Sequence, residues 1–254
     1  PGTITAPVIA GGSVYVSAVD ESKVYAFDEK TGKKRWSFLV DANVDSPPSI
    51  YNGLVVFGAA DGHVYCLRAT DGALVWRFRA APYERNIMAF GRVESVWPVH
   101  GSVLIANGLV YVTAGRSSFV DGGIHLFVLD ALTGKLIKQK NIHHIQKDNG
   151  SGERVDQRRM PDHAPGASSN ILVTDGTRIF SRLTELDFGI EIKKGPNDYI
   201  FPAKEALLVP STFADQMWFH KIFWSYGNKI RAVMMCFDPD GVYYCNQFEK
   251  SGPW

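Results

Sequence analysis

The chain has 254 residues, and 27 Lys and Arg against 26 Asp and Glu leave a formal net charge of +1. This balance gives no global field that would attract nucleic acid or an anionic membrane surface. No run approaches the roughly 18 apolar residues of a membrane span, so the sequence predicts no transmembrane segment. With 45% hydrophobic residues, the chain can build a packed core.

The first forty residues predict four short β-strands joined by turns. The strands are expected at 6–10, 13–18, 23–27 and 34–38, where β-branched and aromatic residues are frequent. Gly-Gly, Asp-Glu-Ser and Lys-Thr-Gly separate these strands, and such residues are typical of hairpin turns. The unit therefore resembles a small antiparallel sheet.

The same unit recurs along the chain. The segment 26–36 matches 66–76, and the glycines and tryptophans in the two copies are each 40 residues apart. A third copy covers 107–135, and a fourth opens at 174. Four-stranded sheets that repeat at about 40–50 residues are typical of a β-propeller. No amphipathic helical stretch lies between the strands, which argues against a parallel βαβ fold.

We therefore predict an all-β fold, a β-propeller of four-stranded antiparallel blades, of which about four or five are present. The expected blades are 4–40, 46–80, 99–140, 168–227 and an incomplete 228–254. Two insertions are expected between them, at 81–98 and 141–167.

One motif carries a family resemblance. The spacing Ala26-x-Asp28-x-x-Thr31-Gly32-x-x-x-Trp36 resembles the tryptophan-docking motif of PQQ-like propeller repeats. That family includes quinoprotein alcohol dehydrogenases and the propeller lipoprotein of outer-membrane protein assembly. In it, the tryptophan packs over the glycine turn of a neighbouring blade, where a side-chain-free residue leaves room for the ring.

The resemblance implies structural docking roles for four residues, which are Trp36, Trp76, Gly32 and Gly72. The third unit has Lys138 where the tryptophan would stand, so the docking contact is expected to weaken along the chain. Members of the family close with about seven or eight blades. The resemblance therefore implies missing blades, from a longer parent chain or a partner chain, and a periplasmic or extracellular location.

Candidate ligand-binding residues lie in the segments that break the period. Gly53 and Gly108 are 55 residues apart instead of 41, and the surplus contains Arg92 and Glu94, with His100 at its end. A second insertion, 116–123, adds Arg116 and Asp121. Loops of this kind converge near a propeller's axis, where arginine could bind a carboxylate or sulfate and histidine could act near neutral pH. The alternative is that Arg92–Glu94 and Arg116–Asp121 are local ion pairs and that His100 is a structural turn residue.

Cysteines and acidic turns predict neither a disulfide nor a metal site. Cys66 lies in an apolar run and is expected to be buried. Cys236 and Cys245 flank the turn 238–241, but neither register of a short hairpin places them directly opposite each other. The Asp-Gly turns lack the ligand spacing of a calcium loop. We therefore expect no cofactor.

Three functions are compatible with the sequence. The first is a non-catalytic extracytoplasmic scaffold that binds a protein or glycan, which requires no special residues. The second is a PQQ- and calcium-dependent quinoprotein dehydrogenase. Resemblance to that branch implies an adjacent cysteine pair under the quinone, and no two cysteines are adjacent here. The third is a polysaccharide-active propeller enzyme that uses the Arg, Glu and His candidates.

Overall fold

The computed structural model describes most of the first 142 residues and parts of the remainder. The described residues are 2–89, 91–100, 103–116, 120–142, 171–181, 184–194, 207–208, 224–226, 230–232, 234–238 and 241–245. Their regular structure is β-strand throughout, apart from one 3-10 turn, η1 (Val19–Glu21). None of the described segments forms a helix long and apolar enough to cross a bilayer. The all-β prediction is confirmed.

Four antiparallel sheets of four strands each follow one another in chain order. The first sheet consists of β1 (Val8–Ala10), β2 (Ser13–Ala18), β3 (Lys23–Asp28) and β4 (Lys34–Leu39). The second consists of β5 (Ser49–Tyr51), β6 (Leu54–Gly58), β7 (His63–Arg68) and β8 (Leu74–Arg79). The third consists of β11 (Leu104–Ala106), β12 (Leu109–Ala114), β13 (Ile124–Asp130) and β14 (Leu136–Ile142). The fourth consists of β15 (Leu172–Thr174), β16 (Ile179–Ser181), β17 (Thr184–Leu186) and β18 (Ile192–Lys194).

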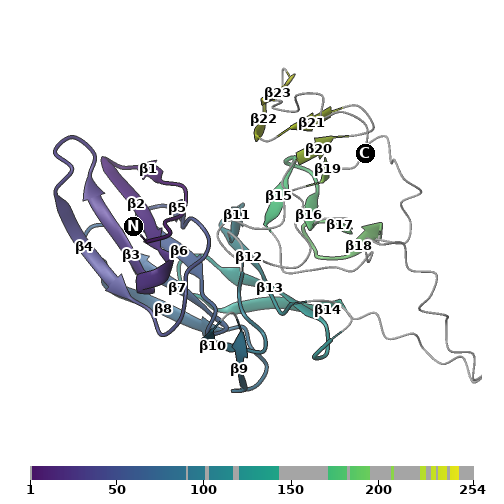
Figure 1. Cartoon of the computed structure of the whole chain (residues 1–254). Helices are drawn as coiled ribbons and strands as arrows, with labels where there is room; N and C mark the ends of the chain where they lie inside the picture. Colours follow the sequence, from purple (N-terminus) through teal and green to yellow (C-terminus); the bar gives the residue numbers. More distant parts are fainter. Residues whose placement is uncertain are drawn as a thin grey trace, which may run out of the picture.

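The sheets are arranged as successive blades of a propeller. Figure 1 shows them side by side, from the purple first sheet on the left to the green fourth sheet on the right. The first strands β5, β11 and β15 lie next to one another, so they form the inner line of the array. The last strands, β4, β8 and β14, lie on the outside and are largely exposed. The chain therefore forms part of a β-propeller.

The cores lie between neighbouring sheets, because successive side chains of a strand point to opposite faces. Val55 and Phe57 of β6 pack toward the first sheet, whereas Leu54 and Val56 pack toward the third. Strand β6 is consequently buried along its whole length. This explains why the second strand of each unit is almost entirely apolar in the sequence.

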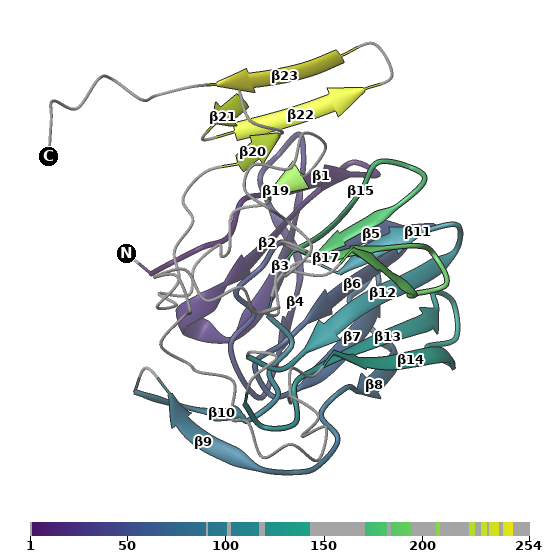
Figure 2. The ribbon, with the colours of Figure 1, turned by 90° about the vertical axis from the view of Figure 1, so that its right-hand side faces the viewer.

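A separate hairpin interrupts the series of blades. It consists of β9 (Asn86–Ala89) and β10 (Arg92–Ser95) and lies within the predicted insertion 81–98. Figure 2 shows it projecting at the lower end of the sheets. The insertion thus folds into a structure of its own.

The later part of the chain differs from the predicted blade boundaries. The fourth sheet ends at Lys194, and a three-stranded sheet follows, with β19 (Leu207–Leu208), β20 (Trp224–Tyr226) and β21 (Ile230–Ala232). Strands β20 and β21 pair with each other, so the boundary expected between 227 and 228 falls inside a hairpin. Almost all of the predicted insertion 141–167 lies outside the described residues.

The last hairpin bears on the cysteines. It joins β22 (Met234–Asp238) to β23 (Gly241–Cys245). In its register Cys236 is paired with Tyr243 and Cys245 with Met234. The two cysteines therefore occupy diagonal positions and are not directly opposite each other, as the sequence analysis expected.

Candidate functional site

Trp36 joins the first sheet to the second. It lies on β4 and is buried, and its Nε1–H donates a hydrogen bond of 2.9 Å to the carbonyl of Ala69. The indole covers Gly72 so closely that an added Cβ at that glycine would lie 2.7 Å from Cδ2 of the ring. Gly72 also has a φ of +73°, which disfavours any other residue. The contact therefore requires both the indole and the glycine.

Trp76 repeats this contact between the second and third sheets. Its Nε1–H donates to the carbonyl of Ala131 at 3.1 Å, and a Cβ at Gly134 would lie 2.6 Å from its Cδ2. Gly134 was not among the predicted docking residues. The signal for it was present in the third repeat, where Thr133-Gly134 has the spacing of Thr31-Gly32 from the preceding aspartate.

Gly32 behaves differently from Gly72 and Gly134. Its turn has the same left-handed φ, +68°, but no described atom lies within 4 Å of a Cβ built on it. Asp28 closes this turn by accepting hydrogen bonds from the backbone N–H and the hydroxyl of Thr31, both at 2.8 Å. The turn is thus fully formed, and no described indole covers it.

The predicted ligand residue Arg92 contacts the first sheet. Its Nη2 lies 2.6 Å from Oδ1 of Asp20 in η1, and Thr3 N–H donates to the other carboxylate oxygen. The hydrogen bond from Thr3, followed by that from Arg92, lowers the pKa of Asp20. Arg92 thus ties the β9–β10 hairpin to the first sheet, where Asp20 stands 72 residues earlier in the chain.

Glu94 forms the most buried ion pair of the insertion. The carboxylate is only 4% exposed and accepts a charge-assisted hydrogen bond from Nη2 of Arg116, which follows β12. Burying two charges is unfavourable unless they are paired, and breaking such a pair costs about 3–5 kcal/mol. The pair therefore holds the hairpin against the third sheet.

His100 is buried and lies beside a carboxylate that the sequence analysis did not select. Its Nδ1 is 2.5 Å from Oδ2 of Asp45, in the connection between the first and second sheets. Both side chains are more than nine-tenths buried. Asp45 stands seven residues before Asn52, and His100 stands seven residues before Asn107. The two residues thus occupy the same repeat position in consecutive blades, and this spacing could have identified Asp45.

The shortest polar contact of Asp121 is made by its backbone carbonyl and not by its carboxylate. Its carbonyl accepts a 2.6 Å hydrogen bond from Nε1 of the buried Trp97, and its carboxylate lies 3.9 Å from Nη1 of Arg85. At that distance and exposure, the ion pair contributes little to stability. Asp121 therefore helps to hold Trp97 in place.

The five predicted residues are distributed over four contacts. Glu94 and Arg116 contact each other, whereas Arg92, His100 and Asp121 pair with residues outside the predicted set. The local pairs Arg92–Glu94 and Arg116–Asp121, the alternative drawn from the sequence, are not the partners that the described structure shows. Each charged group instead bridges separate elements.

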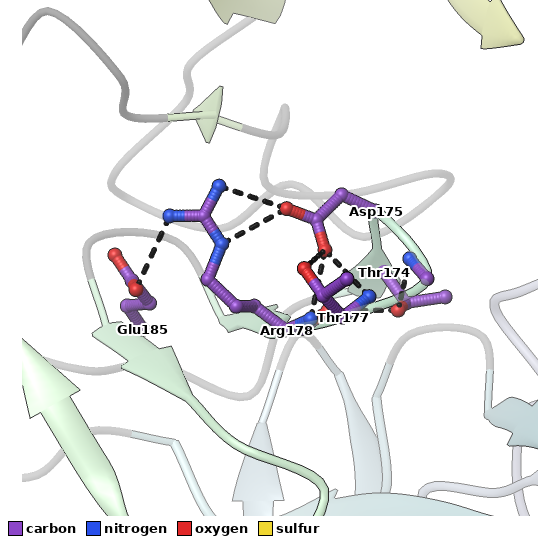
Figure 3. Close-up of polar contacts among 6 residues, drawn as sticks. Thr174, Asp175, Thr177, Arg178 and Glu185 are labelled. Carbon is purple, nitrogen blue, oxygen red and sulfur yellow. Dashed lines mark hydrogen bonds and ion pairs between the residues drawn. The ribbon is translucent and has the colours of Figure 1, made fainter. Parts of the chain in front are cut away.

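A further polar cluster lies on the fourth sheet. In the β15–β16 turn, Asp175 accepts hydrogen bonds from Thr177 and from Arg178, whose guanidinium also reaches Glu185 on β17 (Figure 3). Partial burial opposes ionisation of Asp175, but these hydrogen bonds outweigh it and lower the pKa to about 2. The cluster closes a hairpin turn, as the sequence predicts for an Asp-Gly pair.

The described residues form no cluster of metal-ligating side chains. Among them, no group of three or more His, Cys, Asp or Glu side chains is arranged to hold a metal ion. The guanidinium groups of Arg92 and Arg116 are both engaged by carboxylates. Burial raises the pKa of the Cys66 thiol to about 12, so this cysteine is a small core residue and not a nucleophile.

Comparison with known proteins identifies the repeats. Residues 1–162 match the family model described as outer membrane protein assembly factor BamB. The dehydrogenase subunit of a quinone-dependent alcohol dehydrogenase from Gluconobacter oxydans (strain 621H) is 33% identical over 141 residues, 51% of this chain and 18% of that protein. BamB of Nitrosomonas eutropha is 25% identical over 205 residues, 77% of this chain and 45% of that protein.

A solved structure agrees on the fold. A europium-containing methanol dehydrogenase superimposes with a TM-score of 0.53 at 14% identity, over 82% of this chain and 45% of that one. At this identity the likeness concerns the fold alone. The chain spans about a fifth of the length of the dehydrogenase relative and less than half of the BamB relative.

Proposed function

Because the chain belongs to the propeller family described as outer membrane protein assembly factor BamB, we propose that it is a non-catalytic, extracytoplasmic scaffold that binds a protein partner. The observation that supports this is the use of the charged side chains in the insertion. Arg92, Glu94 and His100 each pair with an oppositely charged or hydrogen-bonding side chain from another segment. Such pairs make a rigid platform, and they leave these groups little freedom to bind or transform a substrate.

The hairpin presents its binding surface on its other face. Val93 is paired directly with Met88, so both point away from Glu94, and they are 58% and 71% exposed. Tyr83, at the base of the hairpin, is 70% exposed and contacts the ring of Trp97. Exposed apolar side chains on a rigid support are suited to burial by a protein partner.

A protein partner is favoured over a glycan. The relatives are named as an assembly factor and as a subunit of a dehydrogenase, and both names describe proteins that act together with other proteins. The words "outer membrane" in the family description support a location outside the cytoplasm.

Site-specific photo-crosslinking tests this proposal. A photoreactive residue is placed at Met88, which is 71% exposed, and a matched control at Leu39, which is 67% exposed on β4 of the first sheet. We expect one reproducible crosslinked partner from position 88 in the native cell envelope, and its loss when Val93→Ser and Tyr83→Ser are added. Equal crosslinking from position 39, or none from position 88, would contradict the proposal.

A quinoprotein dehydrogenase is the second candidate, and the 33% identity to an alcohol dehydrogenase subunit favours it. Titration of the purified chain with PQQ and Ca²⁺, followed by the absorbance of the quinone and the fluorescence of the protein, separates the two. The scaffold proposal expects no saturable binding. Saturable, calcium-dependent binding would favour the dehydrogenase.

A further inference from the structure

The turns that join the third strand of each sheet to its outermost strand lie at the opposite end of the blades from the β9–β10 hairpin. In the second sheet, the start of β7 adjoins the insertion, because a Cβ on Gly62 would lie 2.7 Å from Cβ of Ala81 and 3.0 Å from Oγ of Ser95. From there β7 runs for 6 residues, about 20 Å, to the turn that contains Gly72. These turns therefore form a surface separate from the hairpin face proposed for a protein partner.

One repeat position beside these turns carries an exposed aliphatic side chain in three consecutive sheets. Leu74, Leu136 and Ile192 each lie next to a β-bulge near the start of the outermost strand, so their positions are equivalent. Their side chains are 50%, 40% and 40% exposed. A single exposed aliphatic residue is common on a protein surface, but the same position in three neighbouring sheets forms a row.

Neighbouring side chains widen this aliphatic row. The strand register skips Val75 of β8 and Ile137 of β14, which are the bulged residues. A bulge leaves its extra residue outside the ladder pairing and re-aims the side chain. Val75, Ile137 and Leu132 in the third turn are each about half exposed.

The first sheet carries lysines where the later sheets carry aliphatic residues. Lys30 and Lys34 stand at the repeat positions of Leu132 and Leu136. Residues 28–35 hold four cations against two carboxylates, so this turn has a local charge of +2 although the whole chain has only +1. The positive charge is thus concentrated beside the aliphatic row.

The charges of these lysines are not neutralised by described carboxylates. Most lysines and arginines in the described part of the chain form an ion pair. Lys30, Lys33, Lys34 and Lys135 are exposed, and none of them has a carboxylate partner among the described residues. They are therefore available to an anionic partner.

Contact between sheets does not use these positions. An indole covers Gly72 in the second sheet, yet Thr70 and Leu74 on either side of that glycine remain exposed. Lys30 and Lys34 are the equivalent residues of the first sheet. The lysines thus belong to the outer surface whether or not another sheet covers the turn glycine.

We propose that this surface binds an anionic lipid bilayer through a rim of aliphatic and lysine side chains, which includes Lys30, Lys33, Lys34, Leu74, Leu136 and Ile137. The aliphatic side chains enter the boundary between headgroups and acyl chains, and the lysines lie against the lipid phosphates. Apolar burial and attraction to anionic lipids add together in binding at a membrane surface.

The composition of the rim favours a bilayer over a protein partner. Protein interfaces are enriched in aromatic residues, Met and Arg and depleted in Lys, and Leu and Val are under-represented at their hot spots. The rim consists of Leu, Ile, Val and Lys. The hairpin, by contrast, exposes Tyr83 and Met88. The two ends of the blades therefore differ in the chemistry of the partner they suit.

Co-sedimentation of the purified chain with lipid vesicles tests the proposal. We expect binding to mixed phosphatidylcholine and phosphatidylglycerol vesicles, and roughly tenfold weaker binding or less to phosphatidylcholine alone. Lys30→Gln, Lys33→Gln and Lys34→Gln together should weaken binding to the anionic vesicles by roughly a hundredfold. Replacement of the same three lysines by arginine is the matched control, and it should retain binding because the charge is kept.

A second pair of variants tests the aliphatic part at constant charge. Leu136→Ser with Ile137→Ser should weaken binding to the anionic vesicles by roughly tenfold. Leu39→Ser is the control, because it removes an aliphatic side chain that is 67% exposed at the far end of β4. All of these side chains are exposed, so thermal melting should show each variant folded.

Met88→Ser separates this proposal from the one for the hairpin, because it should leave vesicle binding unchanged. Equal binding to neutral and anionic vesicles, binding to neither, or full binding by the triple glutamine variant would refute the bilayer contact. A photoreactive residue at Leu136 that crosslinks to one protein of the native cell envelope, and not to lipid, would also overturn it, because the occupant would then be a protein.

Discussion

The interfaces between successive sheets are built in two different ways. Between the second and third sheets, Trp76 covers Gly134, and the contact is buried and mainly apolar. Between the third and fourth sheets, Lys138 replaces the tryptophan, and Lys138 and Lys140 bind Glu191 at 3.1 and 2.5 Å. The indole contact depends on shape and burial, whereas the lysine contact is an exposed ion pair that water and salt weaken.

The sheet whose turn is covered (the receiving sheet) changes together with the sheet that supplies the tryptophan (the donating sheet). In the fourth sheet the left-handed position of the turn is held by Ile190, with a φ of +57°, where the other turns have glycine. Ile190 is fully buried in the core between the third and fourth sheets. A β-branched residue at positive φ is strained, so its burial must compensate for that strain. The buried apolar side chain thus comes from the fourth sheet, as Ile190, because the third sheet has Lys138 at the tryptophan position.

The largest effect is expected from removing an indole. Trp76→Ala should lower the free energy of unfolding by about 3–5 kcal/mol, because it removes a buried ring and leaves a cavity over Gly134. Trp76→Phe keeps much of the burial and loses the hydrogen bond to Ala131, so its effect should be smaller. Urea denaturation of both variants measures the difference. Equal losses would mean that the hydrogen bond, and not the packing, holds this interface.

Substitution of the glycines should separate the covered turns from the open one. Gly134→Ala combines a left-handed alanine with a clash against Trp76 and should cost about 3 kcal/mol. Gly32→Ala carries only the backbone strain and should cost about 1 kcal/mol. The denaturant midpoints of the two variants check this order, provided that the slope of the unfolding free energy against denaturant concentration is the same in both. The reverse order would show that the Gly32 turn is covered in the isolated chain.

The interface between the third and fourth sheets should accept a tryptophan-on-glycine contact only when both sheets are changed. Lys138→Trp or Ile190→Gly alone should destabilise the chain, because each leaves a clash or a cavity. The double variant should recover part of the loss, with a coupling energy of about 1 kcal/mol in a double-mutant cycle. Strictly additive losses would show that the two positions do not act together.

The smallest effect is expected at Glu191. Hydrogen bonds from Lys140, and then from Lys138, lower the pKa of this carboxylate below its usual value of 4.5. The ion pairs therefore contribute stability above that pH, and the contribution is lost on acidification through the lowered pKa. Glu191→Gln should shift the melting midpoint by about 1 °C or less, and the shift should shrink in high salt. A salt-independent shift would argue against an ionic contact.

The fold was more predictable than the site. Strand positions in the first sheet were predicted to within about two residues, because Gly-rich turns and β-branched runs are local signals. The partners of Arg92 and His100 were not predicted, since Asp20 and Asp45 come from distant segments of the chain. Glu94 was expected near Arg116, but their ion pair was not predicted. A charged residue finds its partner through the tertiary arrangement, and its nearest opposite charge in the sequence is a poor guide.

The amino-acid sequence alone determined the repeating sheet, the turn glycines and the tryptophans that belong with them, because hairpin geometry and strand alternation are set over a few residues. Only the tertiary structure decided which glycine each indole covers and which one stays open at Gly32. It also decided that Ile190 takes the glycine's place in the fourth sheet. These outcomes depend on the distance between neighbouring sheets. That distance is set by how the side chains of the two facing sheets pack together.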